Sequence, residues 1–104
     1  MYKVLKPLHG ITNVAAAGTE VRLTATPTLV SKVLIVAKDG NTGNIFVGGA
    51  LVSSTSYGVT LTAGESVSLS AGDVQAEVGL IDLSTIWIDC SVSGEGVSYL
   101  YFAD

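Results

Sequence analysis

The chain has 104 residues and a formal net charge of -4, with 9 acidic and 5 basic side chains. Apolar residues make up 48% of it and charged residues only 13%, which excludes a disordered chain, since such chains are poor in apolar side chains. The length is typical of a single domain. Because no apolar run approaches the roughly 20 residues of a bilayer-spanning helix, and residues 1–10 lack the pattern of a secretory signal, we expect no membrane partner.

The residue types that carry catalysis or bind metals are scarce. His9 is the one histidine and Cys90 the one cysteine, so neither a disulfide within the chain nor a His-rich metal site can form. The sequence contains no motif that pairs a nucleophile with a base, and nothing in it specifies two carboxylates across a cleft. We therefore expect no enzyme, catalytic residue, metal or cofactor. A net acidic chain without a basic cluster also argues against a nucleic-acid partner.

The N-terminal third contains three candidate segments. Residues 2–8 are interrupted by Pro7, which predicts an arm or an edge strand, and we expect residues 1–14 to be a short N-terminal arm to a single domain over residues 15–104. Residues 19–26 alternate between apolar and polar side chains, which predicts a half-buried strand.

Residues 32–38 place five apolar side chains in a row between two lysines. So short a run predicts a strand covered on both faces, in a sandwich core or at a subunit contact. Turn signals at Asp39-Gly40 and Thr42-Gly43 then predict a β-hairpin over residues 32–47. Residues 57–62 and 65–70 predict two further strands, the second with Val67 and Leu69 inward and its serines outward.

The C-terminal third predicts two strong strands. Residues 83–92 alternate, with Ile88 and Cys90 on the inward face, and residues 94–96 turn the chain into a last strand over 97–102, which predicts a second hairpin. Residues 99–102 are apolar on both faces. Either this strand is central in its sheet, or one of its faces packs on a neighbouring subunit.

These segments predict an all-β fold, an antiparallel β-sandwich or jelly roll of about eight short strands with a short N-terminal arm. A small domain this apolar leaves apolar surface outside its core, and such surface usually marks an interface. We therefore expect a homo-oligomer. The residues that we expect at interfaces are Lys3, Lys6, Trp87, Tyr99, Tyr101 and Phe102.

Trp87 alternates onto the polar face of its strand, where a tryptophan often meets a partner or a ligand. The alternative is that Trp87 lies in a second layer of the fold. Aromatic rings also stack on sugars while amides satisfy sugar hydroxyls, so Trp87 and Tyr57 together with Asn41 and Asn44 are the residues that a carbohydrate-binding β-sandwich would use.

Four stretches together resemble small structural proteins of tailed bacteriophage particles. They are Lys32–Ala37, Asn41–Gly48, Leu61–Val67 and Asp82–Ile88. Their shared pattern is an alternating strand, an Asn-x-Gly hairpin into a short aromatic-aliphatic strand that ends in Val-Gly, a Gly-Glu-Ser turn, and an aspartate-leucine step into a final hairpin. The resemblance covers roughly residues 19–102 and is one of strands and turns, without a catalytic signature.

The resemblance implies a non-enzymatic virion structural protein, with a capsid decoration (cement) protein favoured. Such a protein clamps neighbouring capsid subunits, commonly as a symmetric oligomer. The implied partners are further copies of the chain, a trimer favoured over a dimer, and the major capsid protein. The implied location is the capsid surface of the virion, after synthesis in the host cytoplasm. The N-terminal arm, which carries Lys3 and Lys6, is expected to tether the chain to the shell. The alternatives are another virion component (tail, fibre or connector) or the carbohydrate-binding module.

Overall fold

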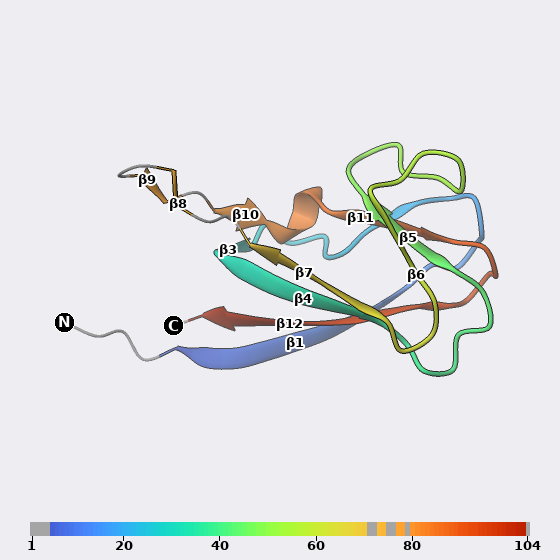
Figure 1. Cartoon of the computed structure of the whole chain (residues 1–104), viewed down its shortest axis with the longest axis horizontal. Helices are drawn as coiled ribbons and strands as arrows, with labels where there is room; N and C mark the ends of the chain where they lie inside the picture. The colour runs from blue at the N-terminus through green and yellow to red at the C-terminus, as the bar shows by residue number, and fades with distance from the viewer. Residues whose placement is uncertain (1–4, 71–72, 75–76, 79, 104) are drawn as a thin grey trace.

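The computed structural model describes residues 5–70, 73–74, 77–78 and 80–103 (Figure 1). In this part the chain is built of antiparallel strands and one 3-10 turn, which confirms the all-β, sandwich-like fold. Sheet I has the order β1 (Lys6–Asn13), β12 (Gly96–Ala103), β4 (Lys32–Ala37) and β7 (Ser66–Ser70). Sheet II has the order β2 (Val21–Arg22), β11 (Trp87–Cys90), β5 (Ile45–Gly48) and β6 (Val59–Leu61).

Short elements lie between these strands. β3 (Leu29–Val30) pairs with β10 (Ile81–Asp82), and β8 (Asp73–Val74) pairs with β9 (Glu77–Val78). The 3-10 turn η1 (Leu83–Thr85) follows β10. No helix among the described residues is long and apolar enough to cross a membrane.

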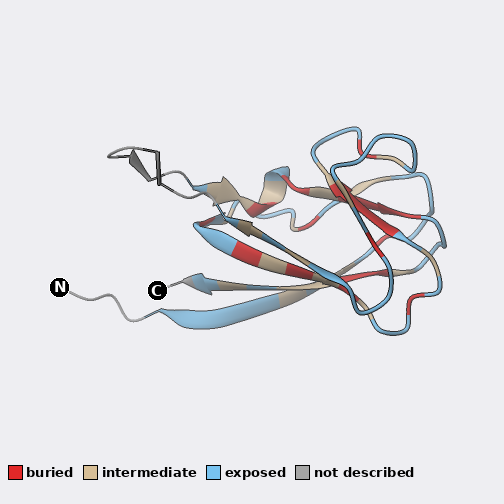
Figure 2. Ribbon diagram, in the orientation of Figure 1, coloured by how far each residue is buried: buried red, intermediate tan, exposed pale blue. Residues whose placement is uncertain are grey.

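The core lies between the two sheets and is filled by the inward face of each strand. Val33, Ile35 and Ala37 on β4 are fully buried, and Ile88 and Cys90 on β11 approach them from sheet II. Because side chains alternate across a strand, the buried positions are spaced by two residues. Figure 2 shows this as alternating red segments along β4 and as continuous red where β5 and β11 meet. The buried apolar cluster also includes Val14, Leu23, Val30, Ile45, Val47, Leu61, Leu83, Ile86 and Val97.

Successive strands mostly cross from one sheet to the other. β4 lies in sheet I and β5 in sheet II, and β11 and β12 are likewise separated. The hairpins predicted over residues 32–47 and between residues 83–92 and 97–102 are therefore wrong. The turn residues are real, but each turn is an arch over the edge of the core, because both strands bury their inward faces in the same interior. Among the described strands of sheets I and II, only β5 and β6 pair directly with their neighbour in sequence.

Of the two alternatives for the first segment, an arm or an edge strand, the structure has the edge strand: Lys6–Asn13 pairs with β12 along its whole length. The Val14 N–H donates to the Glu95 carbonyl at 2.9 Å. By alternation, the backbone nitrogen of Pro7 then points to the free edge of the sheet. Its missing N–H therefore removes no hydrogen bond between β1 and β12. Residues 1–4, including Lys3, lie outside the described part of the chain.

Two other predicted strands are shorter than expected. Residues 19–26 contain only the two-residue β2, and Leu23 is buried whereas Ala25 is exposed. Residues 83–92 begin with the turn η1, which forms because the Asp82 carboxylate accepts the N–H of Ser84 at 2.9 Å. Such a side-chain cap satisfies a donor that a strand would have bonded to its neighbour.

Candidate interaction surfaces

The outer face of sheet I is apolar at its centre. Leu34 on β4 points away from the core and lies opposite Leu100 on β12. Leu100 is 37% exposed and Phe102, on the same face of β12, is 50% exposed. Lys32, Leu34, Ser68, Leu100 and Phe102 together line a hollow of about 210 Å³.

The two edge strands of sheet I complete this face in different ways. On β1, Ile11 lies opposite Ser98 and is 63% exposed. On β7, Ser66, Ser68 and Ser70 point outward while Val67 and Leu69 pack against the core, as predicted. We call the apolar surface formed by Ile11, Leu34, Val36, Leu100 and Phe102 the outer strip. The serines of β7 border the outer strip on one side, and the exposed Ile11 and His9 of β1 form its border on the other.

The outer face of sheet II is covered by loops of the same chain. The Asp89 carboxylate is only 1% exposed and accepts the N–H groups of Gly18 at 3.0 Å and Cys90 at 2.8 Å. The Phe46 ring lies 5.1 Å from the Tyr57 ring, centroid to centroid. The surface that sheet II turns away from the core is therefore largely used within the fold.

Trp87 lies on this second face and is half-buried. The Arg22 guanidinium carbon stands 5.2 Å from the centre of its ring, a cation–π contact with the neighbouring strand β2. Of the sugar-binding candidates, Asn41 is buried and its amide donates to the Gly96 carbonyl at 2.9 Å. Asn41 thus joins the arch after β4 to β12, which ties it into the fold.

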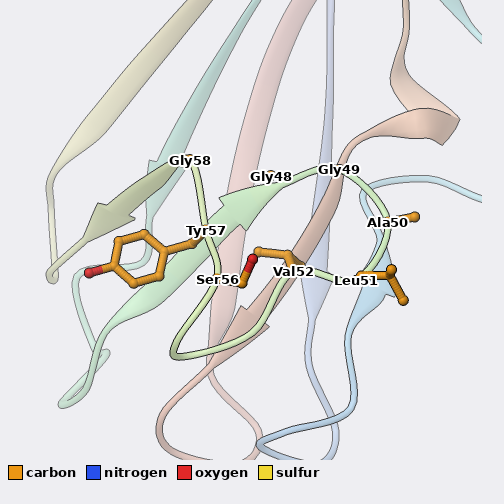
Figure 3. A pocket seen from close by; sticks show the side chains of 8 residues that line it. All are labelled: Gly48, Gly49, Ala50, Leu51, Val52, Ser56, Tyr57 and Gly58. Atoms are coloured by element: carbon orange, nitrogen blue, oxygen red, sulfur yellow. The ribbon is translucent and has the colours of Figure 1, made fainter.

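A second hollow, of about 230 Å³, lies inside the loop that joins β5 to β6 (Figure 3). Glycines and small side chains line most of it, and Val52 is buried and anchors the loop. Leu51 is 82% exposed and holds a left-handed backbone with φ of 73°. No signal in the sequence marks this residue, because the left-handed conformation ordinarily belongs to glycine.

The residues expected at interfaces do not share one surface. Tyr99 and Tyr101 point inward from β12 and pack against the core, with ring centroids 6.1 Å apart. Phe102 lies on the outer strip, Lys6 is exposed on β1, and Trp87 is on sheet II. The structure thus brings Phe102 together with Leu34 and Leu100, which the sequence marked only as runs that are apolar on both faces.

The side chains with catalytic chemistry are dispersed. His9 is exposed on the outer face of β1. Cys90 is 2% exposed, and burial, followed by the neighbouring Asp89 carboxylate, raises the pKa of its thiol. Within the described ranges, no three His, Cys, Asp or Glu side chains are grouped so that they could hold a metal ion.

Glu95 has a role in the fold. Its carboxylate accepts the N–H groups of Thr42 at 2.6 Å and Gly43 at 2.8 Å, together with the Thr42 hydroxyl at 2.9 Å. These bonds hold the pKa of Glu95 below its ordinary value, the backbone donors having the largest effect. The carboxylate fastens the arch between β4 and β5 to the arch between β11 and β12.

Comparison of the chain with protein-family models, curated proteins and solved structures gives no match.

Proposed function

We propose that the chain is a non-enzymatic structural protein of a phage virion, with the role of a capsid decoration protein that binds and stabilises the shell as a homo-oligomer. The observation that carries the proposal is the outer strip, where Leu100, Phe102 and Ile11 expose apolar surface on one continuous face. Soluble domains rarely leave such a surface free unless it meets a partner. The resemblance of the strand and turn pattern to phage structural proteins supplies the kind of assembly.

An oligomeric subunit suits this role for a physical reason. A small domain contacts each capsid subunit over a limited area, so a single contact is weak. Joining several copies makes the later contacts intramolecular, which raises the overall affinity without new contacts. Glu95 and Asp89 fasten the arches and loops of the chain to its sheets, so the domain would act as a rigid clamp.

Co-sedimentation tests the proposal. The purified chain is mixed with empty capsids assembled from the major capsid protein encoded in the same genome, and the pellet is analysed for both proteins. We expect saturable binding at a fixed ratio to the capsid subunit, together with a raised disassembly temperature of the shell. Absence of the chain from the pellet at saturating concentration would refute the decoration role.

A further inference from the structure

We infer that the outer strip is covered by the same strip of a second copy, so that two sheets I pack face to face around a two-fold axis. This inference rests on the proposed function for the idea that the chain is an assembly subunit, and it names the partner of that surface. A two-fold contact uses one patch twice, so the patch must be complementary to itself.

The rows of side chains across sheet I provide that complementarity. The register places His9, Leu100, Leu34 and Ser68 in one row, and Ile11, Ser98, Val36 and Ser66 in the next. A two-fold axis parallel to the strands, between β12 and β4, lays β12 over β4 of the second copy and β1 over β7. Leu100 then faces Leu34 of the second copy, and this contact occurs twice.

The same axis also gives a partner to Lys32, the charged residue beside the outer strip. Lys32 and Phe102 line the same hollow within one chain, and the rotation puts Lys32 over the Phe102 ring of the second copy. The lysine stem covers apolar surface while its ammonium meets the ring face, a cation–π contact that forms twice. A two-fold axis perpendicular to the strands would instead place Lys32 over Val36, an aliphatic side chain that cannot form a cation–π contact with the ammonium. The axis along the strands is therefore favoured.

The geometry and area suit two packed sheets. Face-to-face sheets keep their strands within about 30° and lie about 10 Å apart, and an axis parallel to the strands gives this alignment. The strands of sheet I have eight, eight, six and five residues, and together they cover roughly 440 Å² per copy. The two copies together bury roughly 900 Å², the size of a weak, transient interface. The contact closes at two copies, in place of the trimer expected from the sequence, and dissociates on dilution.

Pairing of two β1 edges is the main competing arrangement. That edge is eight residues long and exposed, but Pro7 offers it no N–H, and edge pairing would leave Leu100 and Phe102 uncovered. The two arrangements predict different neighbours for Ile11. In the face-to-face dimer Ile11 meets Ser66 of the second copy, whereas the two Ile11 side chains are about three strand spacings apart, roughly 14 Å. In the edge-paired dimer the two Ile11 side chains come together.

Sedimentation equilibrium from about 10 μM to about 1 mM measures the association. We expect the mass to rise from that of the 10.6 kDa chain to twice that value. Leu100→Glu is expected to raise the dissociation constant about tenfold or more, because it places a charge at the centre of the contact. The matched control Leu51→Glu, at an exposed leucine in the β5–β6 loop, is expected to leave the constant unchanged. Circular dichroism of both variants verifies folding.

Crosslinking tests the register. A short bismaleimide is expected to join a mixture of the Ile11→Cys and Ser66→Cys chains, and neither chain alone, while the buried Cys90 does not react. A chain that stays monomeric up to 1 mM, or that crosslinks through Ile11→Cys alone, would overturn the inference. A monomer that still co-sediments with capsids would refute the face-to-face dimer and leave the decoration role standing, so the two failures are distinguishable.

Discussion

The Asp89 carboxylate accepts the N–H of Gly18 at 3.0 Å and so ties the loop before β2 to the outer face of sheet II. The same side chain accepts the Cys90 N–H at 2.8 Å, and it is almost wholly buried. By alternation along residues 83–92, Asp89 shares the polar face of its strand with Trp87. The structure shows that a loop of the chain covers that face at Asp89, which is why the face can carry a buried acid.

Replacement of Asp89 by alanine is expected to lower the free energy of unfolding by about 2 kcal/mol, because it leaves the buried Cys90 N–H without an acceptor and removes the hydrogen bond that holds the loop at Gly18. Urea unfolding measures the change. Asp39→Ala, at an exposed carboxylate, is the matched control and is expected to stay within about 0.5 kcal/mol of the original chain. Equal stability of the two variants would show that the Gly18 contact does not hold the loop.

The inward and outward alternation of individual strands could be predicted from the sequence, and the pairing of the strands could not. Val67 and Leu69 point inward and Ser66 outward, as the alternation requires. However, residues such as Asp39 and Gly40 favour a chain reversal whether the returning strand joins the same sheet or crosses to the other one. Only the packing of both sheets on one core decides between a hairpin and an arch.

Part of the apolar outer face of sheet I could be predicted from the sequence, and its role as an interface stays a prediction. Phe102 was expected at an interface, and the apolar runs around Leu34 and Leu100 were expected either in the interior or at a subunit contact. β12 is both central in its sheet and apolar on its outer face, so the two alternatives for residues 99–102 are compatible. Tyr99 and Tyr101 could not be separated from Phe102 in advance, because alternation assigns two faces without saying which one is the core.

The hydrogen bonds that the Glu95 carboxylate accepts from Thr42 and Gly43, called the clasp here, predict that the stability of the fold depends on pH. Its pKa is lowered from the ordinary value of 4.5, so the ionised carboxylate stabilises the fold above pH 4.5, and this contribution is lost as the pH falls through the lowered value. We expect the Tm to fall as the pH is taken from about 5 to about 3. Glu95→Gln should have a lower Tm at neutral pH and a shallower fall in acid.

Part of the acid sensitivity should remain in Glu95→Gln. Hydrogen bonds from Thr62 to Glu65 and from Ser84 to Asp82 also lower the pKa of those carboxyls. Differential scanning calorimetry across the pH range separates these contributions when Glu65→Gln is measured in parallel. An acid profile of Glu95→Gln that is superimposable on that of the original chain would mean that the clasp does not contribute.

The burial of Cys90 predicts that its thiol reacts slowly with thiol reagents in the folded chain. Its sulfur lies 3.8 Å from the Val14 carbonyl oxygen, and burial raises its pKa, so little thiolate is present or accessible at neutral pH. We expect an aromatic disulfide reagent to react about tenfold or more slowly with the folded chain than with the chain in denaturant, because reaction requires local opening. A folded chain that reacts at the rate of a free thiol would contradict the core packing of β11.

Leu51 should be replaceable by glycine with a gain in stability. Its left-handed backbone costs a residue with a side chain about 1–2 kcal/mol, and its exposed side chain contributes little packing in return. Glycine removes that strain at an added entropic cost of about 0.5–1 kcal/mol. We therefore expect Leu51→Gly to raise the free energy of unfolding by about 0.5 kcal/mol, measured by urea unfolding, whereas Ala50→Gly, at the preceding exposed position, should lower it. If Leu51→Gly is instead destabilising by more than Ala50→Gly, the Leu51 side chain contributes to the fold through contacts that its exposure does not reveal.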